Sequence, residues 1–261
     1  MDFVNVKKKR SRLVENPRGS EKPMRKAADD AISKLEPEGL LPEGEGWQQR
    51  KSSETRIVIL EATIECLARY GYARTTTQLI AKIAKVSRGA MIHHYATKQE
   101  LIAAVTEYAF YKHMERFSRA IRALSDEERI DRNAGIEADW RVCLSREYKA
   151  YFELHVAART DEELNRIFMP CAIRHDQAWT EELLHVFPEW RDKRDKLILT
   201  RKFVRAALAG MVLHHDIWDD PEAESSLLRM IASAVKQIRE GDLAASSPGE
   251  TVPAARKRRR A

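Results

Sequence analysis

The sequence predicts an all-helical protein of about nine helices. Apolar residues recur at intervals of three and four through the central part of the chain, which is the spacing of one face of an α-helix. Glycine and proline are scarce, at 10 and 9 of 261 residues, and several prolines lie outside residues 50–240. Strands separated by Gly/Pro turns are therefore hard to place. A hydrophobic content of 43% is enough for a buried helical core.

The first helix is expected to begin at Ser52 or Ser53. It should end at Gly71, because glycine readily adopts the left-handed conformation that closes a helix. The helical spacing predicts one buried apolar face, formed by Ile57, Leu60, Ile64, Leu67 and Ala68.

Hydroxyl residues mark the next two helix starts. Thr75-x-x-Gln78 has the pattern of a capping box, in which side chains satisfy the free backbone amides of a helix start. It predicts a short second helix that ends near Ala84. Ser87 is expected to cap a third short helix that runs to about His94.

The remaining helices follow the same rules. Thr97 and Glu100 form a capping box that predicts a long fourth helix, to about residue 124. Short helices are expected after Ser125-x-x-Glu128 and Thr160-x-x-Glu163. Longer helical patterns, with prolines near their starts or ends, cover residues 136–158, 170–187, 192–218 and 222–240.

Both ends of the chain differ from this helical middle. Residues 1–50 and 242–261 are polar and lack a lasting apolar period, so we expect them to be disordered, apart from a short helix near Lys26–Leu35. Each end carries a basic run, Lys7–Arg10 and Arg256–Arg260. These runs are interpreted as solvated tails or as flexible arms attracted to phosphates.

Composition also argues against several classes of protein. The three cysteines, Cys66, Cys143 and Cys171, are widely spaced, which disfavours a disulfide framework or a zinc site and fits a reducing cytoplasm. No apolar signal segment begins the chain. The longest uncharged stretch of the helical region, 206–215, is too short to cross a bilayer. We therefore expect a soluble cytoplasmic protein with no membrane contact, cofactor or metal.

Basic charge is concentrated where the short helices are predicted. Residues 51–98 contain eight Lys and Arg and three acidic residues, a local net charge of 8 − 3 = +5, against +6 for the whole chain. A local excess of this kind suits a polyanionic partner.

A specific motif lies in the same region. From Gly71 to Val105 the chain reads GYARTTTQLIAKIAKVSRGAMIHHYATKQELIAAV. It resembles the DNA-binding domain of the TetR family of bacterial regulators, whose pattern is approximately T-x-x-x-I-A-x-x-A-G-V-S-x-G-x-x-Y-x-H-F-x-x-K-x-x-L. The positions in register are Ile80, Ala81, Ala84, Val86, Ser87, Gly89, His94, Tyr95, Lys98 and Leu101.

The resemblance implies a three-helix helix-turn-helix domain at residues 51–98 and a helical ligand-binding and dimerisation bundle at 99–241. The implied function is a homodimeric transcriptional regulator, a repressor of a palindromic operator in double-stranded DNA that a small apolar or aromatic ligand releases. A DNA-binding architectural or partner-recruiting factor without a ligand is the alternative. An enzyme built on His155, His175 or the pair His214 and His215 is a third, disfavoured reading, because no catalytic motif occurs.

The third helix is short and must be held by its neighbours, and its expected outward residues suit entry into a major groove. Hydroxyls and backbone amides at helix starts can hold phosphates. The candidate DNA-binding residues are Thr75, Thr76, Lys85, Ser87, Arg88, Ala90, Ile92, His93, His94 and Lys98. Met91 and Tyr95 are expected in the core instead.

Three departures from the family pattern concern the operator. Lys85 replaces the usual turn glycine and must tolerate a possible positive φ. Ile92 replaces a phosphate-binding tyrosine and could pack on thymine methyl groups. Leu79 and Ile83 make the second helix more apolar than usual and could cover a partner surface, such as the N-terminal extension.

A stripe of aromatic and polar-tipped side chains on the expected helix 136–158 is interpreted as helix core or as one wall of a ligand cavity. It consists of Trp140, Leu144, Tyr148, Tyr151 and His155, with opposite walls expected from Phe168, Trp179, Met211 and His214. The stripe lacks clustered Lys or Arg, so no strongly anionic ligand is expected.

Two last helices are expected to form the dimer interface. Small residues on helix 192–218, among them Gly210, allow a close approach of helices. Helix 222–240 offers Leu227, Leu228, Ile231, Val235 and Ile238 at helical spacing.

Overall fold

A computed structural model describes residues 35–37, 40, 46–125, 127–128 and 132–241. The short helix expected near Lys26–Leu35, both basic runs and nearly all of the segments expected to be disordered lie outside these residues.

The described residues form helices and no strand, as the sequence predicts. Nine α-helices and one short 3-10 helix occur among them: α2 Trp47–Tyr70, α3 Thr77–Ala84, α4 Arg88–His94, α5 Lys98–Arg122, α7 Arg132–Cys143, α8 Arg146–Ala157, α9 Glu162–Val186, η1 Pro188–Lys193, α10 Arg194–Trp218 and α11 Pro221–Glu240.

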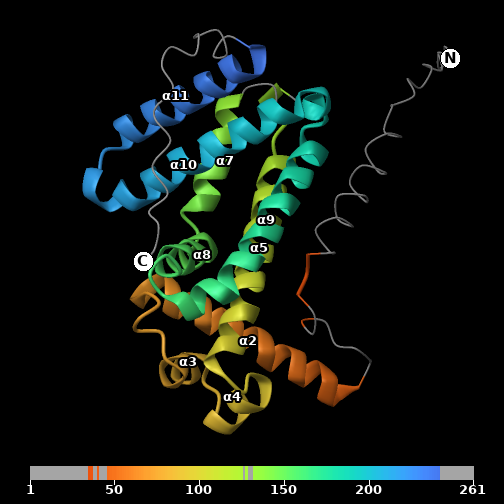
Figure 1. The fold of residues 1–261 in the computed structure, drawn as a ribbon, viewed down its shortest axis with the longest axis vertical. Coiled ribbons are helices and arrows are strands. Elements are labelled where there is room, and N and C mark those ends of the chain that lie inside the picture. The colour runs from red at the N-terminus through yellow and green to blue at the C-terminus, as the bar shows by residue number, and fades with distance from the viewer. Residues whose placement is uncertain (1–34, 38–39, 41–45, 126, 129–131, 242–261) are drawn as a thin grey trace, which may run out of the picture.

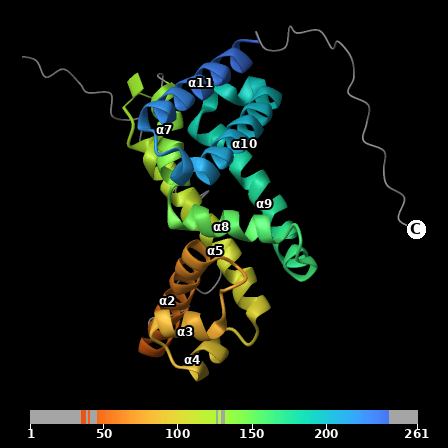
Figure 2. The ribbon, with the colours of Figure 1, turned by 90° about the vertical axis from the view of Figure 1, so that its left-hand side faces the viewer.

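The molecule is elongated, with the short helices at one end (Figure 1). There α3 and α4 pack beside α2, and the long α5 rises from them into the body, where it packs against α7, α8 and α9. At the far end α10 and α11 lie against each other and against α7. Figure 2 shows α8 crossing the middle of the molecule, directly above α2.

Two clusters of buried side chains hold these helices together. The first extends from α2, α3 and α4 through α5 to α8 and α9, and includes the fully buried Ile64, Leu101 and Phe168. The second joins α7, η1, α10 and α11 around residues such as Trp190 and Leu208. Because the first cluster is continuous, the short helices share apolar packing with the body.

Capping explains most helix starts. Thr76, Ser87, Thr97 and Ser145 each accept a hydrogen bond from the backbone N–H three residues later. At α5 the Glu100 carboxylate also accepts from the N–H of Ala96, the residue before the cap. The predicted caps at Ser87 and Thr97 and the predicted box of Ser125 and Glu128 are thus confirmed.

The expected cap at Thr75 is wrong by one residue. Its hydroxyl donates to the Gly71 carbonyl at 2.7 Å and its side chain is fully buried, whereas Thr76 caps α3. The pattern places two hydroxyls side by side, and only tertiary packing decides which one faces the helix start.

Two long helices also differ from the prediction. The expected helix 136–158 is broken at residues 144 and 145, because Ser145 caps a new helix and α8 leaves α7 in a new direction. Conversely, α9 runs through Pro170 without interruption, and Asp161, not Thr160, caps it. The first helix begins at Trp47, before the expected Ser52.

Leu79 and Ile83 are half-buried and pack against the first cluster. Leu35 also packs on this cluster and Leu40 is buried in it. None of the described helices is both long and apolar enough to cross a membrane.

Candidate functional site

The turn between α3 and α4 has the geometry of a helix-turn-helix. Lys85 ends α3 in the left-handed conformation, with φ 55° and ψ 36°, as its place at the usual glycine position requires. Its backbone N–H bonds back to the Lys82 carbonyl, and Ser87 then starts α4. The turn is therefore tight although no glycine is present.

Helix α4 is only seven residues long and is held by one side. Met91 is buried on α4, and Tyr95 is buried directly after it. Opposite them, Arg88 and His93 are exposed and Ile92 is 51% exposed. This face carries one permanent charge, one imidazole and one apolar side chain, and nothing in the described protein covers it.

Most predicted DNA-binding residues lie on the same end of the molecule. Thr76, Lys85, Ser87, Arg88, Ile92 and His93 are exposed around α3 and α4, and Ala90 is half-buried. Thr75 is the exception, because its side chain is buried and its hydroxyl is used by the backbone.

Two further candidates are partly engaged within the protein. The Lys98 ammonium lies 4.5 Å from the centre of the Tyr72 ring. His94 is half-buried, and burial, then the nearby His93 and Arg56, lower its pKa. Both reach solvent, but each is also positioned by a neighbour.

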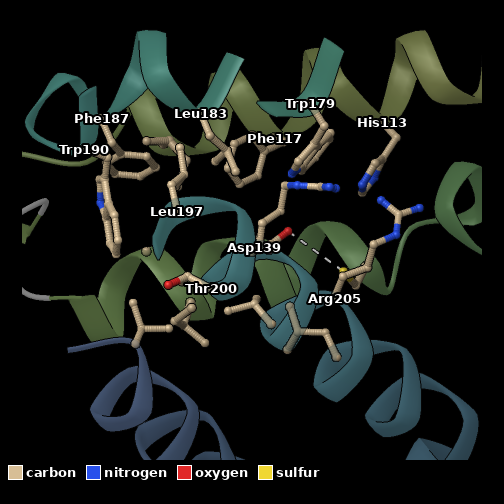
Figure 3. Close-up of a pocket in the computed structure, with 18 of the residues that line it drawn as sticks. His113, Phe117, Asp139, Trp179, Leu183, Phe187, Trp190, Leu197, Thr200 and Arg205 are labelled. Atoms are coloured by element: carbon tan, nitrogen blue, oxygen red, sulfur yellow. Dashed lines mark hydrogen bonds between the residues drawn. The ribbon is translucent and has the colours of Figure 1, made fainter. Parts of the chain in front are cut away.

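A cavity lies in the body of the protein, between α5, α7, α9, η1, α10 and α11 (Figure 3). Phe117, Trp179, Leu183, Phe187 and Trp190 form an apolar wall on one side, and Asp139, Thr200 and Arg205 lie opposite (Figure 3). A second cavity adjoins it and shares Tyr148, Arg201 and Arg205 with it.

The structure brings only some of the predicted ligand residues to these cavities. Tyr148 and Trp179 line the first cavity, and Tyr148, Tyr151 and His155 line the second. Trp140, Leu144, Phe168, Met211 and His214 line neither.

The break at Ser145 explains much of this difference. Trp140 lies on α7 and its ring meets His215, so it does not continue the line of Tyr148 and Tyr151 on α8. Phe168 is fully buried beneath Tyr151 and His155. A single stripe on one helix was expected, and the protein divides it between two helices.

Sequence reasoning missed several polar groups of the first cavity. They include His113, Asp139, Thr200, Arg201 and Arg205. Two of them could have been noticed in the sequence, because Arg201 and Arg205 stand one turn apart on α10, directly before the uncharged stretch 206–213. The sequence around Asp139 gives no comparable indication.

Burial dominates the electrostatics of this cavity. Burial lowers the pKa of His113 to about 3, with Arg205 and Arg116 adding to the effect. Burial raises the pKa of Asp139 to about 7, and Arg205 and a long contact from Cys143 Sγ only partly oppose it. His113 is therefore neutral near pH 7, and Asp139 is partly protonated there.

A hydrogen-bonded chain joins the second cavity to α5. The Tyr151 hydroxyl lies 3.1 Å from His175 Nδ1, and His175 Nε2 lies 2.6 Å from Glu107 Oε2. Burial alone would raise the pKa of Glu107, but hydrogen bonds from His175 and Cys171 lower it to about 2. Glu107 is thus an ionised acceptor that fixes the imidazole, and the imidazole fixes Tyr151.

Helix α8 also contacts the helix-turn-helix directly. Glu153 Oε1 accepts the backbone N–H of Tyr72 at 2.7 Å, and Arg146 pairs with Glu61 of α2. A side chain at Gly71 would bring its Cβ to 3.0 Å from Glu153 Oε1. Because φ is +77° there, the backbone favours glycine, and a side chain would in addition crowd Glu153.

The adjacent histidines near the end of α10 are used separately. His214 Nδ1 lies 2.9 Å from the Gly210 carbonyl, and His215 Nδ1 lies 3.1 Å from Glu224 Oε2. Across the described part of the chain, no three metal-ligating side chains are gathered into a possible metal site.

Comparisons with known proteins agree with this architecture. Residues 59–105 match the profile of bacterial regulatory proteins of the tetR family. An HTH-type transcriptional regulator of Mycobacterium tuberculosis is 29% identical over 192 residues, which cover 71% of this chain and 95% of that protein. The HTH-type transcriptional regulator TtgR of Pseudomonas putida is 28% identical over 193 residues, with coverage of 73% and 81%.

Solved structures share the fold. The multidrug binding protein EbrR, crystallised with imidazole, aligns with a TM-score of 0.53 at 18% identity and covers 70% of this chain and 93% of its own. A TetR family transcription regulator from Marinobacter aquaeolei aligns with a TM-score of 0.52 at 18% identity, over 72% and 97%. The matching segment 59–105 and the capped helix-turn-helix thus make this chain similar to the bacterial regulatory proteins of the tetR family, and the solved structures share its helical fold.

Proposed function

We propose that this protein is a transcriptional repressor that binds a palindromic operator as a homodimer in the cytoplasm and is released by a small, mainly aromatic ligand. The observation that carries the proposal is the position of α4. It projects from the end of the molecule with Arg88, Ile92 and His93 exposed, while Met91 anchors its other side.

The exposed face of α4 has the chemistry to read base edges. Arg88 can donate two hydrogen bonds to a guanine, and Ile92 can contact thymine methyl groups. Around it, the hydroxyl of Thr76 and the charges of Lys85 and Lys98 are suited to phosphates, which position the helix on the duplex.

The outer face of α10 supports a dimer. Apolar and small residues that are exposed or, at Gly210, half-buried follow one another at intervals of four and three along this helix, the spacing of a helix–helix seam. They are Leu199, Phe203, Ala206, Gly210, Leu213 and Ile217, and α11 adds the exposed Met230. We call these seven residues the outer stripe. A monomer would leave this stripe in water.

The expected interface residues on α11 need correction. Leu228, Ile231, Val235 and Ile238 are buried within the subunit, where they pack on α7 and α10. A charge at Ile231 would therefore damage the core of one subunit and would not report on the dimer.

Helix α8 is suited to transmit ligand binding to the DNA. It carries Tyr148 and Tyr151 at the cavities and Glu153 and Arg146 at the helix-turn-helix. A ligand that favours one tilt of α8 would change the distance between the two α4 helices of the dimer. It shifts the equilibrium only by the difference between its affinities for the two states.

Operator binding by matched variants tests the DNA interface. Arg88→Ala should weaken binding by ~1–3 kcal/mol and relax the preference at one base pair, because the base contact is lost. Lys98→Ala should weaken binding to all sequences alike and reduce the salt slope by about one unit. Lys236→Ala, which removes an exposed charge from α11 at the opposite end of the molecule from α4, is the control (Figure 1). Unchanged affinity of both test variants at two salt concentrations would contradict the proposal.

A further inference from the structure

Arg205 stands between the two cavities without a polar partner. It lines both, and its guanidinium carbon lies 6.0 Å from the centre of the Tyr151 ring. Among the residues that the structure describes, no hydrogen bond or ion pair joins this guanidinium to an acceptor. Five N–H donors on a half-buried side chain are thus available to a bound molecule.

The neighbouring arginine shows how such a charge is normally satisfied. Arg201, one turn earlier on α10 and also lining both cavities, holds Asp176 with two contacts of 2.7 and 2.8 Å. Its charge is therefore compensated within the protein. Arg205 is the cation that the cavity leaves for a ligand.

The other lining residues indicate which apolar and polar groups a ligand of this cavity would carry. Phe117, Trp179, Phe187 and Trp190 present flat apolar surfaces to the first cavity. Thr200 Oγ1, also on the lining, is buried and has no hydrogen-bond partner among the described residues. An aromatic body with one charged group and room for one further polar atom matches this surface.

The sign of the charged group follows from the acids near Arg205. Asp139 and Glu189 line the same cavity, and among the described residues no ion pair joins either of them to Arg205. Glu189 is exposed, whereas Asp139 is half-buried. Burial raises the pKa of Asp139 to about 7, because the ionised side chain has lost water without gaining a close cationic partner. A cationic ligand would need Asp139 ionised and would lie close to Arg205, whereas an anionic one pairs with a charge that is always present.

We propose that this cavity binds an aromatic monocarboxylate, with its ring on the Phe117 and Trp179 side and its carboxylate on Arg205. The proposal rests on the proposed function, because it names the ligand class of the regulator. One negative charge is enough, since Arg205 is the single uncompensated arginine among the described lining residues.

Three probes with one ring system and different charge test the inference. We would titrate the full-length protein with naphthoate, naphthylmethanol and naphthylmethylamine by calorimetry, without DNA. The acid should bind at least about tenfold more tightly than the alcohol and the amine, because it forms a charge-assisted hydrogen bond with Arg205. Equal or tighter binding of the amine or the alcohol, or binding of none of the three, would overturn the proposal.

Variants then assign the effect to one side chain. Arg205→Gln should remove the advantage of naphthoate over naphthylmethanol, and Arg205→Lys should restore part of it. Arg141→Gln is the control, because it removes an exposed charge on α7 that does not line the cavity. It should leave the affinities for naphthoate and naphthylmethanol unchanged. An advantage that persists in Arg205→Gln, with an unchanged circular dichroism spectrum, rejects the assignment. Operator binding is measured separately, so a failure of the ligand class leaves the DNA-binding function standing.

Discussion

At the scale of single residues, the cavity holds two buried ionisable groups with opposite shifts. The pKa of His113 falls to about 3, below its ordinary value of 6.5, and the pKa of Asp139 rises to about 7 from 3.8. Between pH 3.8 and pH 6.5 the unfolded chain carries the extra proton on His113, and the folded protein carries the extra proton on Asp139. The two contributions to pH-dependent stability therefore oppose each other in this range.

Single substitutions should separate these contributions. In Asp139→Asn, the His113 contribution remains, so the free energy of unfolding should rise with pH relative to wild type, by up to about 1.4 kcal/mol per unit between about pH 5 and 6.5. In His113→Gln, the Asp139 contribution remains, and the free energy of unfolding should fall with pH by a similar amount. Urea unfolding at several pH values measures both. Profiles parallel to wild type in both variants would show that neither group is shifted.

Lys85 offers a second test at this scale. A non-glycine residue in the left-handed region is strained by roughly 1–2 kcal/mol, and Lys85 has φ 55°. Lys85→Gly should raise the free energy of unfolding by roughly 0.5–1 kcal/mol, because relief of strain exceeds the greater freedom of glycine in the unfolded chain. Lys85→Ala removes the same charge without relieving the strain, so it should bind DNA like the glycine variant but show no gain in stability.

At the scale of helices, the sequence predicts most elements but not how they meet. The caps at Ser87 and Thr97 and the stop at Gly71 follow from local chemistry, and each is in place. The break at Ser145 was missed because a serine also fits inside a helix when the apolar spacing continues across it. Arg205 and Asp139 come together from α10 and α7, which are far apart in the chain, so spacing alone does not show that they share a cavity.

The contact of α8 with the helix-turn-helix is the clearest link between elements. Glu153 accepts the Tyr72 N–H across the boundary between the DNA-binding end and the body. Glu153→Ala removes a charged acceptor and should lower the free energy of unfolding by about 1–2 kcal/mol. It should also speed amide hydrogen exchange at Tyr72. Glu153→Gln keeps an acceptor oxygen and should lose less. Exchange at Tyr72 that does not respond to Glu153→Ala would show that α8 does not hold this end through Glu153.

At the scale of the whole molecule, one short helix touches few base pairs, so useful specificity requires two half-sites and a dimer to join them. The outer stripe on α10 and α11 is the surface that a second copy of the chain would cover. A Cβ at Gly210 would meet nothing within 4 Å in the subunit, so the subunit leaves open space at this position. Leu213 is 64% exposed, so a charge introduced at this position tests the same surface.

Gly210→Leu and Leu213→Glu should therefore leave the subunit folded and weaken dimer formation by roughly 2–5 kcal/mol, because they create a clash or a buried unpaired charge at the seam. Sedimentation should then show monomers at micromolar concentration. Operator affinity should fall sharply although α4 is unchanged, because each monomer must then bind its half-site alone. Ile173→Glu, a charge at an exposed apolar residue of α9, is the control and should remain dimeric. A wild-type protein that sediments as a monomer would contradict the dimer itself, and dimeric Gly210→Leu and Leu213→Glu variants would move the interface away from the outer stripe.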